Sequence, residues 1–188
     1  MRIIAGELRG RRLVDSKDID FRPTTDRNRE ALFNILLCGR VVKEFGFDLI
    51  DANVLDICCG SGSIAFEALS RGAKSATLID NNNQHLDVAK QNSEILKIEE
   101  KCEFILADAK ISLRNNENVF DLVFIDPPYS EDYSAIAKNL IAKGWIKKDS
   151  LIVIESPVNK DIDDQLDYLE IMDSRKYGIS RFIFCKIK

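Results

Sequence analysis

A carboxylate followed by two prolines and an aromatic residue stands directly after an apolar stretch of the chain. The four residues are Asp126, Pro127, Pro128 and Tyr129, and the stretch before them, Leu122–Ile125, is typical of a buried strand. The prolines remove two backbone donors and stiffen the turn, which fixes the directions of the carboxylate, the Pro127 carbonyl and the ring. Two acceptors beside a flat apolar ring suit a planar substrate with an exocyclic amino group. A stiff strand-to-helix turn without chemistry is the alternative.

The composition is that of a protein with one buried core. The chain has 188 residues, of which 45% are hydrophobic and 31% charged, as is ordinary for a soluble globular protein. No apolar stretch approaches the length that spans a membrane, and the basic start lacks the apolar segment of a signal peptide. We therefore expect a cytoplasmic protein that makes no membrane contact.

Cysteine and histidine form no recognisable metal or nucleophile pattern. The five cysteines are odd in number and lack Cys-x-x-Cys spacing, which favours reduced thiols and no metal. The single histidine, His85, lies in a polar stretch that opens a helix, and we expect it at the surface. Nothing in the sequence indicates an obligate protein partner.

The charge is unevenly distributed along the chain. The net charge is −4, but residues 1–29 contain eight Lys/Arg and five Asp/Glu, so they carry +3 and the remainder −7. The arginines closest to the start of the sequence are Arg2, Arg9, Arg11 and Arg12. Such a basic arm on an acidic body is suited to holding a phosphate backbone. An ordinary solvated hairpin explains the charge equally well.

From residue 48 onward, apolar runs of strand length alternate with helical patterns. The expected strands are residues 54–57, 75–79, 102–107, 119–125, 151–154, 166–172 and 179–187, with helices at 63–70, 84–96 and 135–142. The alternation predicts a Rossmann-like α/β domain with a mostly parallel seven-stranded sheet. The short link between the last two strands favours an antiparallel C-terminal strand.

A smaller extension is predicted ahead of this domain. Residues 2–5 and 11–14 flank a turn-prone segment and favour a hairpin, and the pattern of residues 31–36 predicts a helix. Thr24, Thr25 or Asp26 is suited to cap that helix. We thus expect an extension over residues 1–47 and a main domain over residues 48–188.

Four aspartates fall at or just beyond the ends of four successive predicted strands. They are Asp56, Asp80, Asp108 and Asp126. The carboxyl ends of parallel strands face one crevice, where ligands of open α/β sheets bind. Four carboxylates around one crevice repel each other unless something positive or rich in donors lies between them. For Asp80 and Asp108, solvated turn residues that cap the following helices remain the alternative.

A glycine loop follows the first of these strands. Gly60 and Gly62 allow a close approach of the backbone to a ligand, and Asp80 lies twenty positions beyond Gly60, where an acid that binds ribose is expected. Nicotinamide enzymes and S-adenosylmethionine enzymes share this pattern. The preceding Asp56 disfavours a pyrophosphate but complements the sulfonium and ammonium groups of S-adenosylmethionine. We expect Asp56 at the methionine end, Asp80 at the ribose and Asp108 at the adenine amino group.

Together these residues resemble Class I S-adenosylmethionine-dependent methyltransferases that act on amino nitrogens, and most closely the bacterial 16S rRNA (guanine-N2) methyltransferases. The resemblance rests on residues 2–6, 9–11, 22–27, 29–34, 55–62, 67–73 and 126–129. The motif at 126–129 is shared with DNA adenine methyltransferases, whereas the N-terminal segments and residues 67–73 narrow the match to the guanine enzymes. The chain departs from the pattern at Cys58, where the broad motif has glycine, and at Cys59, where related enzymes usually have alanine.

The resemblance implies a substrate, a cofactor and a set of contacts. The substrate would be 16S rRNA in the small ribosomal subunit or in its assembly intermediate, and residues 22–26, with Thr24 and Thr25, would lie over the S-adenosylmethionine. Asp126 and the Pro127 carbonyl would accept the two N–H bonds of the guanine amino group, and Tyr129 would stack on the base. The sequence leaves open whether Asp126 takes the released proton or only orients the group.

Three other functions fit parts of the pattern. A DNA adenine-N6 methyltransferase would share the motif at 126–129, but the chain lacks an obvious DNA-reading domain. A nicotinamide oxidoreductase leaves Asp56 and the Pro-Pro-Tyr turn unexplained. A non-catalytic RNA-binding assembly factor would not need the intact glycine loop.

Overall fold

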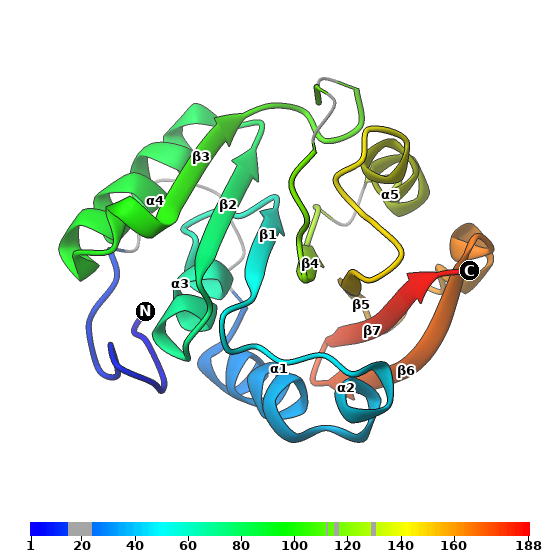
Figure 1. The fold of residues 1–188 in the computed structure, drawn as a ribbon, viewed down its shortest axis with the longest axis horizontal. Coiled ribbons are helices and arrows are strands. Elements are labelled where there is room, and N and C mark those ends of the chain that lie inside the picture. Colours follow the sequence, from blue (N-terminus) through cyan, green and yellow to red (C-terminus); the bar gives the residue numbers. More distant parts are fainter. Residues whose placement is uncertain (15–23, 112, 115–116, 129–130) are drawn as a thin grey trace.

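The computed structural model describes residues 1–14, 24–111, 113–114, 117–128 and 131–188, and in them the chain forms one seven-stranded sheet (Figure 1). The strands are β1 (Asn53–Ile57), β2 (Ser75–Asp80), β3 (Cys102–Leu106), β4 (Leu122–Ile125), β5 (Leu151–Pro157), β6 (Leu169–Tyr177) and β7 (Ser180–Ile187). Their order in the sheet is β3-β2-β1-β4-β5-β7-β6. The first five strands are parallel, and β7 is antiparallel to both of its neighbours. The predicted mostly parallel sheet with an antiparallel C-terminal strand is thereby confirmed.

The helices surround this sheet. They are α1 (Asp26–Cys38), α2 (Arg40–Phe45), α3 (Ser63–Ser70), α4 (Asn83–Leu96) and α5 (Tyr133–Ala142), with short 3-10 helices η1 (Glu99–Lys101) and η2 (Asp163–Leu166). Thr25 is the N-cap of α1, where its side chain accepts a hydrogen bond from the Asn28 amide. Helix α2 was not predicted. Two glycines bound it, since Gly39 ends α1 and Gly46 closes α2 at φ +78°.

Several strand bounds differ from the sequence prediction, some of them by one residue only, and β6 also ends at Tyr177 rather than at 172. Strand β4 begins at Leu122 rather than at residue 119, and β5 continues to Pro157 rather than ending at 154. Strand β6 begins at Leu169 rather than at 166, because η2 occupies Asp163–Leu166. The extension of β5 matters for the site, since it brings a further acidic residue to the end of a parallel strand.

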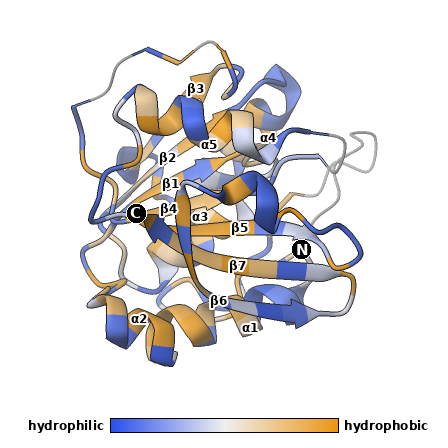
Figure 2. Ribbon diagram, turned by 90° about the vertical axis from the view of Figure 1, so that its right-hand side faces the viewer, coloured by the Kyte–Doolittle hydropathy of each residue, from blue (hydrophilic) through white to orange (hydrophobic). Residues whose placement is uncertain are grey.

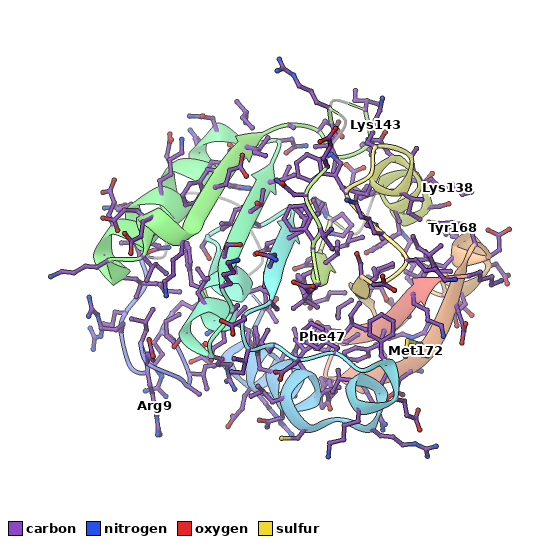
Figure 3. The ribbon with its side chains drawn as sticks, viewed as in Figure 1. Arg9, Phe47, Lys138, Lys143, Tyr168 and Met172 are labelled. Carbon is purple, nitrogen blue, oxygen red and sulfur yellow. The ribbon has the colours of Figure 1, made fainter. Side chains whose placement is uncertain are left out.

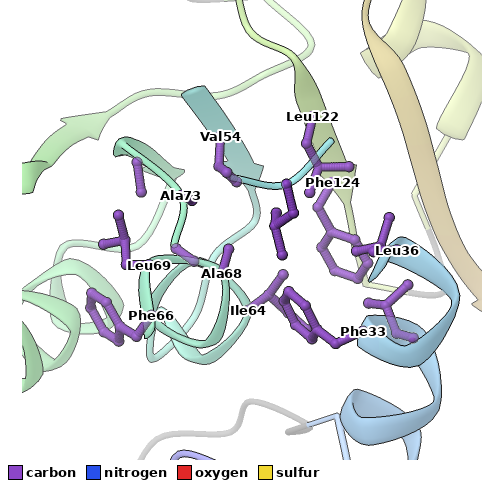
Figure 4. Packing of buried hydrophobic residues seen from close by; sticks show 14 of the residues in the cluster. Phe33, Leu36, Val54, Ile64, Phe66, Ala68, Leu69, Ala73, Leu122 and Phe124 are labelled. Carbon is purple, nitrogen blue, oxygen red and sulfur yellow. The ribbon is translucent and has the colours of Figure 1, made fainter. Parts of the chain in front are cut away.

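Apolar side chains alternate between the two faces of the sheet and form one core on each. On the first face, residues such as Val54 and Phe124 pack against α1–α4 (Figure 4). On the second, Leu55 and Ile125 pack against α5. The central strands are largely hydrophobic, whereas most helices carry both hydrophilic and hydrophobic residues (Figure 2). Helix α3 is buried at every residue. Among the described residues, no helix is both long and apolar enough to span a membrane.

The N-terminal residues form a hairpin that docks on α3. An antiparallel bridge joins Arg2 to Arg12, and the Ile3 amide donates to the Arg11 carbonyl at 2.9 Å. The fully buried Glu67 carboxylate accepts from the amides of Ile4 at 2.8 Å and Ala5 at 3.0 Å. These two hydrogen bonds hold the hairpin to a helix more than sixty residues away in the sequence. The division into an extension and a main domain stays a prediction.

Gly6 makes this docking possible. Its φ of +83° lies in the left-handed region, and a Cβ built on it would lie 1.8 Å from the backbone carbonyl oxygen of Ser70. The next residue donates its amide to that same oxygen at 2.7 Å. The hairpin therefore approaches α3 too closely for any side chain at this position.

Replacing Gly6 by alanine tests this close approach. Gly10 is a matched control, because its φ is +82° but nothing lies within 4 Å of the added Cβ. We expect Gly10→Ala to lower the free energy of unfolding by about 1–2 kcal/mol through backbone strain alone. Gly6→Ala should lower it by roughly 2–4 kcal/mol, because the clash adds to the strain. Urea denaturation measures both, and equal losses would show that the hairpin does not depend on the contact with Ser70.

Candidate active site

A cavity of about 350 Å³ opens at the carboxyl ends of the parallel strands, as the positions of the aspartates predicted. The predicted site residues that line it are Thr24, Thr25, Asp56, Gly60, Asp80, Asp108, Asp126 and Pro127. The structure therefore brings together one group from the α1 start, the glycine loop and the ends of four strands. Tyr129 lies outside the described residues, and Gly62 does not line the cavity.

Gly62 serves helix packing in this structure. It has a φ of +78° and is the N-cap of α3. A Cβ there would lie 2.5 Å from the Phe66 ring and 2.9 Å from Leu78. The absence of a side chain therefore lets α3 lie close to β2, which is a different use of glycine from the contact to a ligand that the sequence suggested.

The pleat of the sheet accounts for the gathering of carboxylates. Asp56 is paired in register with Leu78 of β2 and with Phe124 of β4, so all three side chains share one face. Asp80 and Asp126 lie two residues beyond these partners and return to the same face. The alternation of side chains along each strand thus directs three acidic side chains, from three neighbouring strands, toward the cavity.

Asp56 is the most deeply buried of these acids. It is 2% exposed, and its Oδ2 accepts a hydrogen bond from the Ala65 amide at 3.2 Å in the first turn of α3. Burial raises the pKa of the Asp56 carboxyl to about 7, against the opposing effect of the Ala65 amide and with a further rise from Asp80. A cationic group near Asp56 would favour its ionised form.

Asp80 is held by backbone donors on both sides. Its Oδ2 accepts from the Gly60 amide and its Oδ1 from the Asn82 amide, both at 2.9 Å. The prediction that His85 is a surface residue is wrong. Its ring lines the cavity, is only 16% exposed, and places Nδ1 3.1 Å from Asp80 Oδ1. Asp80 thus ties the glycine loop to the start of α4.

Glu155 is an acidic site residue that sequence reasoning missed. It lies near the end of β5, lines the cavity and is 4% exposed. The Thr24 hydroxyl donates to its Oε2 at 3.0 Å. Continuing the search for acids at strand ends to the fifth parallel strand would have found it, since the expected strand stopped one residue earlier.

Cys58 and Cys59 form the turn that leaves β1. Both amides donate to the Ile79 carbonyl, at 2.8 and 3.1 Å. Cys58 has a φ of +62°, a left-handed conformation that explains why the broad methyltransferase motif has glycine at this place. Burial raises the pKa of both thiols, and the neighbouring carboxylates raise it further. Neither cysteine is suited to act as a nucleophile.

The cavity lining also includes a cation, Lys110. Lys110 Nζ lies 2.6 Å from Glu131 Oε2, and the Lys110 amide donates to Asp108 Oδ1 at 2.8 Å. Despite this many-sided acidity, the described residues contain no group of three or more His, Cys, Asp or Glu placed to hold a metal ion.

The arginines of the N-terminal hairpin lie outside the cavity. Arg9 and Arg12 are exposed, and Figure 3 shows the Arg9 side chain projecting away from the body of the protein. Arg11 instead donates from Nη2 to the Ile95 carbonyl at 2.6 Å, and Arg2 lies 3.7 Å from Asp26. Two of the four predicted RNA contacts are thus also engaged within the protein.

Comparison with known proteins assigns the chain to a family. Residues 1–186 match the model of the family described as conserved hypothetical protein 95. The chain belongs to this family.

Relatives of this chain carry methyltransferase names. An uncharacterized methylase of Rickettsia prowazekii is 32% identical, with 97% of this chain and 96% of that protein covered. The ribosomal RNA small subunit methyltransferase D of Haemophilus influenzae is 35% identical, with 85% and 80% covered. A solved Escherichia coli structure, described as "putative methyltransferase yhhF", has a TM-score of 0.82 and 29% identity, with 100% and 98% covered. The chain is a methyltransferase with a Class I fold.

The raised pKa of Asp56 predicts an unusual pH dependence of stability. An unfolded aspartate releases its proton near pH 3.9, whereas the native state retains it up to about pH 7, so this group's contribution to the unfolding free energy falls as the pH rises between these values. Asp56→Asn removes that loss. We compare the free energy of unfolding of the variant with that of wild type, both without ligand. The difference should shift in favour of the variant by roughly 2–4 kcal/mol when the pH is raised from about 5 to about 8.

Urea denaturation at both pH values measures this gain. Asp164→Asn, which changes an exposed carboxylate in η2, is the control and should differ from wild type by the same amount at each pH. A pH-independent difference for Asp56→Asn would contradict a raised pKa in the native state.

Proposed function

We propose that this methyltransferase transfers a methyl group from S-adenosylmethionine to the exocyclic N2 amino group of a guanine in 16S rRNA of the small ribosomal subunit or of its assembly intermediate. The observation that carries the proposal is one cavity with two kinds of wall. Asp126 and Pro127 stand on one side, and the glycine loop stands with Asp56, Asp80 and Asp108 on the other. The names of the small-subunit relatives support ribosomal RNA as the substrate.

The residues around β1–β3 fit S-adenosylmethionine. A buried Asp56 whose pKa is raised to about 7 complements the ammonium and sulfonium charges. Asp80, at the end of β2, would hold the ribose hydroxyls, and Asp108, after β3, would accept from the adenine amino group. Gly60 leaves the loop open to the ligand, and Thr24 and Thr25 at the start of α1 would close over it.

When bound, S-adenosylmethionine supplies a methyl group on a positively charged sulfur, and its carbon–sulfur bond breaks with the electron pair kept by sulfur. The protein's part is to prepare the acceptor. The guanine amino group is a poor nucleophile, because its lone pair is delocalised into the ring. Asp126 and the Pro127 carbonyl would accept hydrogen bonds from its two N–H groups and so turn the lone pair toward the methyl group. Alignment of this kind can supply about 7–11 kcal/mol.

The buried Pro127 fixes the geometry of this turn. The Asp126 amide, one residue earlier, donates to the Ile57 carbonyl of β1 at 3.2 Å, so the catalytic turn is attached to the strand that precedes the glycine loop. The N2 nitrogen loses one proton after transfer, and Asp126 is placed either to accept it or only to orient the group. Tyr129 is proposed to stack on the base, which must leave its helical stack to enter.

Two rival functions are weaker on these observations. A DNA adenine methyltransferase would share the Asp126 turn, but the curated relatives point to ribosomal RNA. A non-catalytic assembly factor would need neither the acidic cofactor wall nor the Asp126 turn. Product analysis separates all three.

Labelled methyl transfer tests the proposal directly. With small subunits, naked 16S rRNA and DNA as acceptors, nucleoside analysis should find N2-methylguanosine from ribosomal RNA. Asp126→Ala should lower turnover by roughly a hundredfold or more while S-adenosylmethionine still binds, because an interaction of the transition state is lost. Asp132→Ser, which removes a nearby exposed carboxylate but keeps a capping oxygen for α5, should retain turnover. N6-methyladenine as the product would overturn the proposal.

The exposed arginines of the hairpin should contribute to RNA binding. Replacing Arg9 and Arg12 by glutamine should weaken binding to labelled 16S rRNA and lower the log–log salt slope by about 1–2, because fewer counterions are released. Arg11 is left in place, since it also holds the end of α4. Arg40→Gln with Lys43→Gln on α2 removes the same charge elsewhere and should leave the slope unchanged. An unaltered slope in the hairpin variant would exclude it from the RNA interface.

A further inference from the structure

We propose that Glu155 selects guanine over adenine by accepting the ring N1–H of the target base. This inference rests on the proposed function and adds a specificity residue to the same site. It addresses the choice between the two bases, which the Asp126 turn by itself does not make.

The sheet register places Glu155 beside the Asp126 turn. Ile125, the last residue of β4, pairs with Ile154 of β5, and the residues that follow these two are Asp126, directly beyond β4, and Glu155. Neighbouring residues of parallel strands point to the same face, so the two acidic side chains leave the sheet on the same side. Both line the cavity, on the side away from β2 and β3.

The surroundings of Glu155 are those of a positioned group rather than of a surface acid. The residue is 4% exposed, and its register partner on β7 is Phe182, which is fully buried. Thr24, itself 9% exposed, donates its hydroxyl to Oε2 at 3.0 Å and restricts the rotation of the carboxylate. A carboxylate has about four acceptor positions and can therefore accept from several donors at once.

The acceptors on this wall match one base and oppose the other. In their ionised form Glu155 and Asp126, like the Pro127 carbonyl, only accept hydrogen bonds. The Watson–Crick edge of guanine carries N1–H beside the N2 amino group, which together make three donors in a row. Adenine has an acceptor nitrogen at N1 beside its amino group, and this lone pair would face a buried carboxylate. Desolvated acceptors that meet no donor are costly, so adenine is rejected.

The base 2-aminopurine tests the N1 contact, because it keeps the 2-amino group of guanine but has an acceptor at N1. It also lacks the 6-oxygen, so the change in preference on replacing Glu155, and not the wild-type ratio alone, assigns the effect to this residue. The probe is 16S rRNA, assembled into small subunits, in which 2-aminopurine riboside replaces the guanosine that nucleoside mapping identifies as methylated. For wild-type protein, kcat/KM should be roughly 10- to 100-fold higher for the guanine substrate than for the 2-aminopurine substrate.

Glu155→Gln tests the residue itself. The glutamine keeps the shape and an oxygen for Thr24, and its amide can donate to an acceptor at N1. We expect kcat/KM for guanine to fall by about 10- to 100-fold, while that for 2-aminopurine stays level or rises, so the preference is lost. Glu170→Gln on β6 is the control, because it removes one charge from an exposed residue outside the cavity and should keep the preference.

The outcomes separate this inference from the function on which it rests. Wild-type protein that yields no N2-methylguanosine contradicts the proposed function itself. Wild-type protein that forms N2-methylguanosine but uses both bases equally contradicts only the role of Glu155, and this comparison needs no variant. Glu155→Gln that binds S-adenosylmethionine and melts like the control, yet keeps the full preference for guanine, contradicts it as well.

Discussion

Carboxylates that share a small, partly dry space repel one another, and the cavity of this protein is organised around that repulsion. The native state lessens it with backbone donors, since the Ala65 amide serves Asp56, and the amides of Gly60 and Asn82 serve Asp80. These bonds also set the shape of the site, because the glycine loop and the starts of α3 and α4 must lie where their amides reach an acid. Even so, burial dominates at Asp56 and raises its pKa to about 7. In the proposed function, the positive charge of the methyl donor would favour the ionised form of Asp56.

Backbone amides that donate to a buried carboxylate also attach the N-terminal hairpin. Glu67 is fully buried on α3 and accepts from two hairpin amides, while the Arg71 guanidinium lies 2.8 Å from its Oε1. The net contribution of a buried ion pair to stability is small, whereas the loss of one partner is strongly destabilising because it leaves a buried charge unpaired. Glu67 therefore specifies where the hairpin docks rather than adding much to stability. The basic surface of the hairpin and the cofactor loop that begins α3 are thereby fixed to the same helix.

Much of the fold and part of the site could be predicted because the parallel strands are nearly continuous apolar runs, each followed by a polar residue with a clear role. Helix α2 could not be predicted, because six residues are too few to show a repeated helical pattern. Packing of Val41 and Val42 holds it in place. His85 was misplaced because its contact with Asp80 arises from the strand-to-helix turn and leaves no periodic signal. Glu155 follows the expected fifth parallel strand directly and was accessible to the same reasoning as the four aspartates, whereas its contact with Thr24, 131 residues away in the sequence, was not.

The strand order has a consequence for how the protein is built along its length. The wall proposed to hold the methyl donor comes mainly from β1–β3 and their loops, with Thr24 and Thr25 added from the start of α1. The wall with Asp126 and Glu155 comes from later strands on the other side of β1. The two walls meet where β1 pairs with β4, and again where Lys110, after β3, lies 2.6 Å from Glu131, after β4. On the proposed function, substitutions in β5 would change which acceptor is used while leaving the strands that hold the methyl donor intact. The order of the strands along the chain thus follows the division of the site.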